Sequence, residues 1–150
     1  MNDVGKASKQ RFLTGYKCAE SVLLSIAEAR GIQSEIIPAI ATGFCSGMAR
    51  TGGMCGAVAG SVMGLGLVYG RQNDEQSVDQ LYQVEKIFLQ EFTSRYGCTS
   101  CEGLIHCDFN TEEGKALFHS ANLQEKCFQY VEESASLVME LIAANPPSRK

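Results

Sequence analysis

A run of uncharged residues in the middle of the chain carries glycines at a helical spacing. The run covers residues 51–70, between Arg50 and Arg71, and it has glycine at positions 52, 56, 60 and 64. Residues four apart lie on one side of an α-helix, so these glycines would form a ridge without side chains. Each interior glycine costs roughly 0.5–1 kcal/mol relative to alanine. A compensating gain is therefore expected, either from close packing against another helix or from backbone approach to a bulky cofactor.

The same run is long enough to cross a lipid bilayer, but its glycines and its Thr, Ser and Tyr residues dilute its hydropathy. We therefore expect a buried helix over residues 54–69 and no membrane span. The first turn of this helix would offer free backbone N–H groups, which makes Gly52, Gly53 and Gly56 candidate cofactor-binding residues. The ridge could also join two copies of the chain, so a homodimer through this helix is a further expectation.

The rest of the chain predicts helices and no strands. No stretch alternates strictly between apolar and polar residues, whereas several have a helical period. Longer helices are expected over 9–30, after Asn73 or Asp74 to about residue 96, from 111, and from 123 to just before Asn145; Ser34 could cap a short one. We expect one all-α domain over 1–150, a compact bundle of about five to seven helices whose ends, 1–8 and 145–150, are frayed.

Charge and cysteine content limit the classes of function. The net charge of −4 provides no broad basic surface for nucleic acid. The N-terminal residues show no apolar targeting segment, so a cytoplasmic location is expected. In a reducing compartment, the seven cysteines indicate metal binding or redox chemistry rather than a disulfide framework. They stand at positions 18, 45, 55, 98, 101, 107 and 127.

Individual cysteines carry different signals. Cys98 and Cys101 form the only C-x-x-C pair, which suits a dithiol or half of a metal site. With His106 and Cys107 they could form a local zinc site, although the spacing fits no standard zinc ribbon or finger. Cys55 opens the glycine-rich helix, and this position predicts a lowered thiol pKa. Cys45 and the histidines at 106 and 119 are interpreted as ordinary buried or surface residues.

Four segments together resemble a known family. The first is Gly15-Tyr-Lys-Cys18, and the most specific is Arg50-Thr-Gly-Gly-Met-Cys55-Gly-Ala-Val-Ala-Gly60. The third is Phe92-Thr-Ser-Arg-Tyr-Gly97 with Cys101 four residues later, and the fourth is Glu125-Lys-Cys127. This pattern resembles the C_GCAxxG_C_C family, whose members are described as redox-active. The resemblance implies a helical fold. A domain of the same kind in a multihaem cytochrome is associated with iron–sulfur binding.

The resemblance implies that Cys18, Cys55, Cys101 and Cys127 act together. If the helices bring them together, they would suit an iron–sulfur cluster or zinc, and a redox protein in electron transfer with a partner protein is the preferred hypothesis. A metal-free thiol–disulfide protein with Cys55 and Cys101 as redox thiols is the alternative. A metal-delivery or assembly partner is a third. No hydrolase signature is present, and enzymatic turnover stays open.

Overall fold

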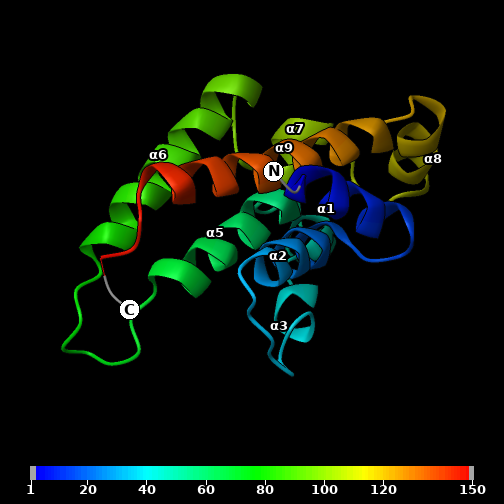
Figure 1. The fold of residues 1–150 in the computed structure, drawn as a ribbon. Helices are drawn as coiled ribbons and strands as arrows, with labels where there is room; N and C mark the ends of the chain where they lie inside the picture. Colours follow the sequence, from blue (N-terminus) through cyan, green and yellow to red (C-terminus); the bar gives the residue numbers. More distant parts are fainter. Residues whose placement is uncertain (1–2, 149–150) are drawn as a thin grey trace.

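The protein is all-helical, as predicted. The computed structural model describes residues 3–148, and within them nine α-helices and no strand are found (Figure 1). The number exceeds the expected five to seven because α3, α4 and α7 are short, with 4, 6 and 5 residues. The helices are α1 Val4–Leu13, α2 Cys18–Ala29, α3 Ala39–Thr42, α4 Cys45–Arg50, α5 Gly56–Tyr69, α6 Asp79–Tyr96, α7 Cys101–Ile105, α8 Glu112–Ser120 and α9 Gln124–Ala144.

Two predicted helices have different bounds in the structure. The helix expected over 9–30 is divided into α1 and α2, because the chain turns at Gly15 with φ +128°. The helix expected after Asn73 begins only at Asp79, since the Asn73 side chain accepts a hydrogen bond from the Glu75 N–H and forms a turn instead. The predicted ends of α5 and α6, at Tyr69 and Tyr96, are confirmed.

The chain ends are more ordered than expected. Residues 1–2 and 149–150 lie outside the described residues. The expectation of fraying over 1–8 is wrong for 4–8, because Asp3 caps α1 and Val4 is buried. Near the other end, Tyr69 donates a hydrogen bond to the carbonyl of Asn145 at 2.7 Å, and Gln80 donates one to the carbonyl of Pro146 at 3.0 Å. These two hydrogen bonds hold Asn145 and Pro146, the first residues of the range 145–150 that was expected to fray.

The glycine ridge packs α5 against α2. A Cβ atom added at Gly60 would lie 2.7 Å from the carbonyl oxygen of Ala19, and one at Gly64 would lie 2.5 Å from Ile26 Cδ1. Close packing within the chain therefore explains Gly60 and Gly64. Helix α9 packs against α1, α2 and α5, and Figure 1 shows α8 near its N-terminal end.

No helix within residues 3–148 combines the length and apolar character that a bilayer span requires. The glycine-rich helix α5 itself has only 14 residues. The expectation of a buried helix here is confirmed, since most of α5 is inaccessible to solvent.

Candidate functional site, a cavity lined by cysteines

Four cysteines from four distant segments line one cavity of about 540 Å³. Cys18 is the first residue of α2, and Cys55 immediately precedes α5. Cys101 is the first residue of α7, and Cys127 lies in the first turn of α9. We call this cavity the thiol chamber. The four cysteines that the family resemblance groups together are thus neighbours in the fold.

Backbone hydrogen bonds hold Cys55 and Cys101 beside each other. The N–H of Cys55 donates to the carbonyl of Thr99 at 2.8 Å, and the N–H of Cys101 donates to the carbonyl of Gly53 at 2.6 Å. The N–H of Gly53 in turn donates to the carbonyl of Gly47 at 3.0 Å. Gly53 therefore positions Cys101 and has no free N–H for a cofactor.

The other two candidate cofactor-binding glycines differ in their surroundings. Gly52 lies next to Glu102, since an added Cβ would be 3.1 Å from its carboxylate, and it does not line the chamber. Gly56 does line the chamber, and a Cβ there would lie 2.1 Å from the sulfur of Cys18. Only a residue without a side chain leaves room for the Cys18 thiol at this point.

Helix α4 forms another wall, and all its residues after Cys45 wind left-handed. Residues 46–50 all have positive φ, from 56° at Met48 to 68° at Gly47. Left-handed backbone costs roughly 1–2 kcal/mol for each residue other than glycine, so the fold maintains this turn at a cost. An added Cβ at Gly47 would lie 2.4 Å from Cys101 Cβ, which shows how closely the turn approaches α7. The turn places Ser46, Gly47 and Arg50 at the chamber.

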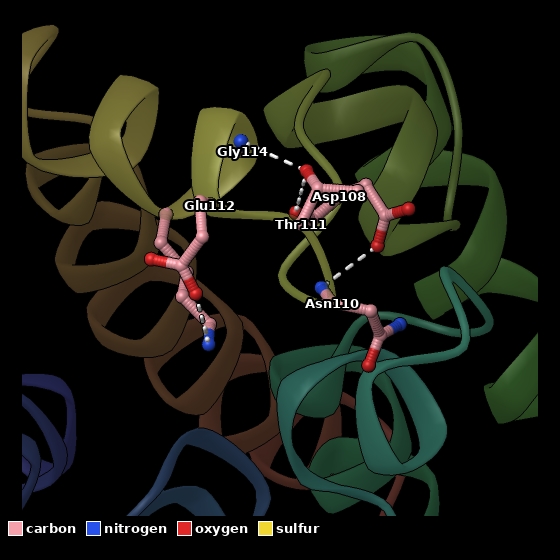
Figure 2. Close-up of polar contacts among 6 residues, drawn as sticks. Asp108, Asn110, Thr111, Glu112 and Gly114 are labelled. Carbon is pink, nitrogen blue, oxygen red and sulfur yellow. Dashed lines mark hydrogen bonds and ion pairs between the residues drawn. The ribbon is translucent and has the colours of Figure 1, made fainter.

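The turn before α8 contributes Phe109 and Asn110 to the chamber lining, and Figure 2 shows the hydrogen bonds of this turn. Thr111 Oγ1 donates to the carbonyl of Asp108 at 3.1 Å and accepts from the N–H of Gly114 at 2.9 Å, so it caps α8 as predicted. Asn110 Nδ2 donates to the carbonyl of Arg50 at 2.6 Å and connects this turn to α4. Helix α8 then carries Lys115, Phe118 and His119 to the chamber.

Burial keeps the thiols of Cys55, Cys101 and Cys127 protonated at neutral pH. It raises the pKa of Cys55 to about 11, although the backbone N–H groups of Val58 and Ala57 act in the opposite direction. The expectation of a lowered Cys55 pKa is therefore wrong, because desolvation outweighs the helix N-terminus. Burial also raises the pKa of Cys101 to about 11, and burial with the neighbouring thiols Cys55 and Cys101 raises that of Cys127 to about 12.

The three remaining cysteines, at positions 45, 98 and 107, do not line the thiol chamber. Cys45 is buried and donates to the carbonyl of Ala41, with a sulfur–oxygen distance of 3.5 Å; contact with the Cys18 thiol, followed by burial, raises its pKa. Sequence reasoning interpreted Cys45 as an ordinary buried residue, since no spacing links it to Cys18.

Cys107 lines a second cavity of about 460 Å³, which shares Cys101 with the thiol chamber. All seven cysteines are free thiols.

The structure contains no preformed site for a single metal ion. Among residues 3–148, no three His, Cys, Asp or Glu side chains are grouped so that they could hold one ion. The local zinc site considered for Cys98, Cys101, His106 and Cys107 is therefore not formed. His106 ends α7 in a left-handed conformation, whereas His119 lines the thiol chamber.

Comparison with known families identifies the chain. A family model described as "Putative redox-active protein (C_GCAxxG_C_C)" matches residues 16–141, a range that includes all four chamber cysteines. Comparisons with curated proteins and with solved structures returned no match. The family match extends over most of the 150 residues and agrees with the resemblance noted in the sequence. The chain therefore belongs to the C_GCAxxG_C_C family of redox-active proteins.

Proposed function

We propose that the protein transfers electrons through an iron–sulfur cluster held by Cys18, Cys55, Cys101 and Cys127. The observation that carries the proposal is the shared cavity, because all four cysteines line it although they come from four separate segments. Iron–sulfur clusters are typically held by four cysteine thiolates. When bound, the cluster would accept and release electrons, and a partner protein would supply or remove them.

The size of the chamber favours a cluster over zinc. A single zinc ion needs its sulfur ligands about 2.3 Å away, and residues 3–148 include no group of three ligands arranged for one ion. A cluster contains several iron and sulfide atoms, so it can join cysteines that are farther apart. The cavity of about 540 Å³ provides space for such a group, and Gly56 keeps the wall beside Cys18 open.

The surroundings of the thiols support ligation more than free thiolate chemistry. Three of the four thiols have a raised pKa because of burial, so without a bound cation they keep their protons at neutral pH. Iron would replace these protons and neutralise the thiolates. The N–H groups of Ala57 and Val58 favour a negatively charged Cys55 sulfur, as expected for groups that stabilise a ligand. The seven free thiols suit a reducing compartment such as the cytoplasm.

Anaerobic purification followed by iron and sulfide analysis tests the proposal. The protein should be brown, absorb near ~400 nm, and contain iron and acid-labile sulfide. Serine variants of Cys18, Cys55, Cys101 and Cys127 should each lose most of the iron. Cys107→Ser is the matched control, since Cys107 lies outside the chamber lining, and it should keep its iron. Protein that stays free of iron after reconstitution, or chamber variants that all keep it, would disprove the proposal.

One contact favours a second candidate, a metal-free thiol–disulfide function. The Cys18 side chain packs against the cluster that contains Cys45, and the two thiols interact, which is the pairing that a disulfide would need. Two thiols would then lose two protons and two electrons, and a disulfide of the partner molecule would be reduced to two thiols. Mass spectrometry after exposure of the metal-free protein to oxidised glutathione distinguishes this case. A Cys18–Cys45 disulfide that forms reversibly supports it, and unchanged free thiols argue against it.

A further inference from the structure

The charged side chains around the thiol chamber all have the same sign. Within the described part of the chain, Lys17, Arg50 and Lys115 line the cavity and no Asp or Glu does. The whole protein has the opposite balance, with 17 acidic and 13 basic residues. The neighbouring cavity shares Arg50 with the chamber, but Glu102 and Asp108 line it as well. Positive charge is therefore concentrated at the thiol chamber against the overall charge of the protein.

The basic residues make up the exposed, charged part of the chamber lining, which we call its mouth. Lys17, Arg50 and Lys115 are exposed, whereas Cys55 and Cys101 are buried. Within residues 3–148 the side chains of Lys17 and Arg50 take part in no ion pair. Lys115 contacts Glu112 at 3.4 Å, but both are solvent-exposed, and such pairs are weak. The cationic groups at the mouth thus remain available for an anion.

Aromatic side chains cover the walls of the chamber. Phe12, Phe109 and Phe118 all line it, and the rings of Phe109 and Phe118 meet edge to face with centroids 5.1 Å apart. The volume of about 540 Å³ is within the range of small-molecule sites, roughly 300–1,000 Å³. Apolar walls with a few charged groups are typical of a site for an organic molecule rather than for a bare inorganic ion.

We infer that the thiol chamber binds a small organic anion. Its charged group would lie at the mouth among Lys17, Arg50 and Lys115, and its apolar part would contact the phenylalanines beside the cysteines. Asn110 supports this arrangement, because its bond to the carbonyl of Arg50 holds the backbone that carries the Arg50 side chain. The inference requires only these side chains, so it does not rest on the iron–sulfur proposal. It would place an anionic substrate or effector directly at the redox thiols.

Isothermal titration calorimetry of the full-length protein with three probes tests the inference. Phenylacetate carries both an aromatic ring and a carboxylate, phenylacetamide lacks the charge, and acetate lacks the ring. Phenylacetate should bind at least about tenfold more tightly than either of the others. No measurable binding of phenylacetate, or equal affinity for its neutral amide, would overturn the inference.

Variants at the mouth show whether the bound anion occupies the proposed position. The triple variant Lys17→Gln/Arg50→Gln/Lys115→Gln should bind phenylacetate at least about tenfold more weakly. Lys86→Gln is the control, because Lys86 is exposed on α6 and does not line the chamber. Its affinity should equal that of the wild type. If the triple variant has a lower Tm than the control, Lys17→Gln alone repeats the test.

Iron analysis of the same variants separates this inference from the proposed cluster. The basic residues should not be needed for metal binding, so the iron content should stay unchanged in the triple variant. If that variant loses iron together with anion affinity, the positive charge serves a negatively charged cluster and the inference is wrong. If wild-type protein contains no iron but still binds phenylacetate through these residues, the inference holds and the cluster proposal fails.

Discussion

The contact between α5 and α2 allows a stability prediction with an internal reference. In Gly60→Ala the new Cβ would lie 2.7 Å from the carbonyl oxygen of Ala19 and 3.0 Å from Val22 Cβ. A Cβ needs about 3.4 Å from a neighbouring atom. The Ala19 carbonyl oxygen and the Val22 Cβ are both fixed to the backbone of α2, so neither can rotate away. The two helices must therefore separate by several tenths of an ångström. Overpacking of this kind typically costs about 1–3 kcal/mol.

A second glycine on the same helix provides the reference. Gly66 has open space where its Cβ would be, with nothing within 4 Å. Replacing either glycine by alanine improves the helix by about 0.5–1 kcal/mol. This benefit cancels in the comparison between Gly60→Ala and Gly66→Ala. The difference in unfolding free energy between the two variants then equals the interface cost alone, about 1–3 kcal/mol.

Thermal unfolding of the metal-free protein, followed by circular dichroism, measures this difference. For a domain of this size, 1 kcal/mol corresponds to about 2–4 °C, so Gly60→Ala should melt about 2–12 °C below Gly66→Ala. Gly66→Ala should melt above the wild type. Equal melting temperatures for the two variants would show that α2 does not pack on the glycine ridge, and the explanation given for these glycines would be refuted.

Three further predictions concern the walls of the chamber. Ala49→Gly should stabilise the protein by about 0.5–1 kcal/mol in urea unfolding, because Ala49 has φ 58° and glycine adopts this conformation without strain; a loss of stability would argue against the left-handed turn. Thr111→Ala should cost about 0.5–2 kcal/mol and speed amide exchange in α8, whereas Thr111→Ser should keep the cap; equal exchange in both variants would contradict the capping role. The metal-free protein should lose stability as the pH rises from 9 to 11. The thiols of Cys55 and Cys101 have an ordinary pKa of 9.0 and a folded value of about 11, so in this window the unfolded chain releases protons that the folded chain keeps. If the urea concentration at the unfolding midpoint does not decrease when the pH is raised from 8 to 11, those values are contradicted. Cys55→Ala should make this decrease smaller.

The helices were predictable from the sequence where local signals determine them. Gly97 ends α6 with φ 92°, and Thr111 caps α8, as their residue types indicate. The break between α1 and α2 at Gly15 was missed, because the apolar period continues across it. The left-handed turn over 46–50 was also missed, since only Gly47 in it prefers positive φ. Contacts with α7, far along the chain, maintain that conformation.

The candidate site was predictable only in part, because a sequence pattern identifies its cysteines but not their surroundings. The family pattern identified Cys18, Cys55, Cys101 and Cys127, and the structure places all four around one cavity. The raised pKa of Cys55 was not predictable, because its depth of burial depends on how four helices pack. The contact between Cys18 and Cys45 and the basic mouth of the chamber have no sequence spacing that could indicate them.

The thiol chamber has a consequence for the order of events during folding. Its four cysteines lie at the starts of α2, α5, α7 and α9, so Cys18 and Cys127 must approach across most of the chain before the cavity exists. Contacts between residues so far apart in sequence form late in folding, because closing long loops costs entropy first. The lining is complete only when α9 has joined the earlier helices. A ligand of the chamber therefore meets its full set of contacts only after these long-range contacts have formed.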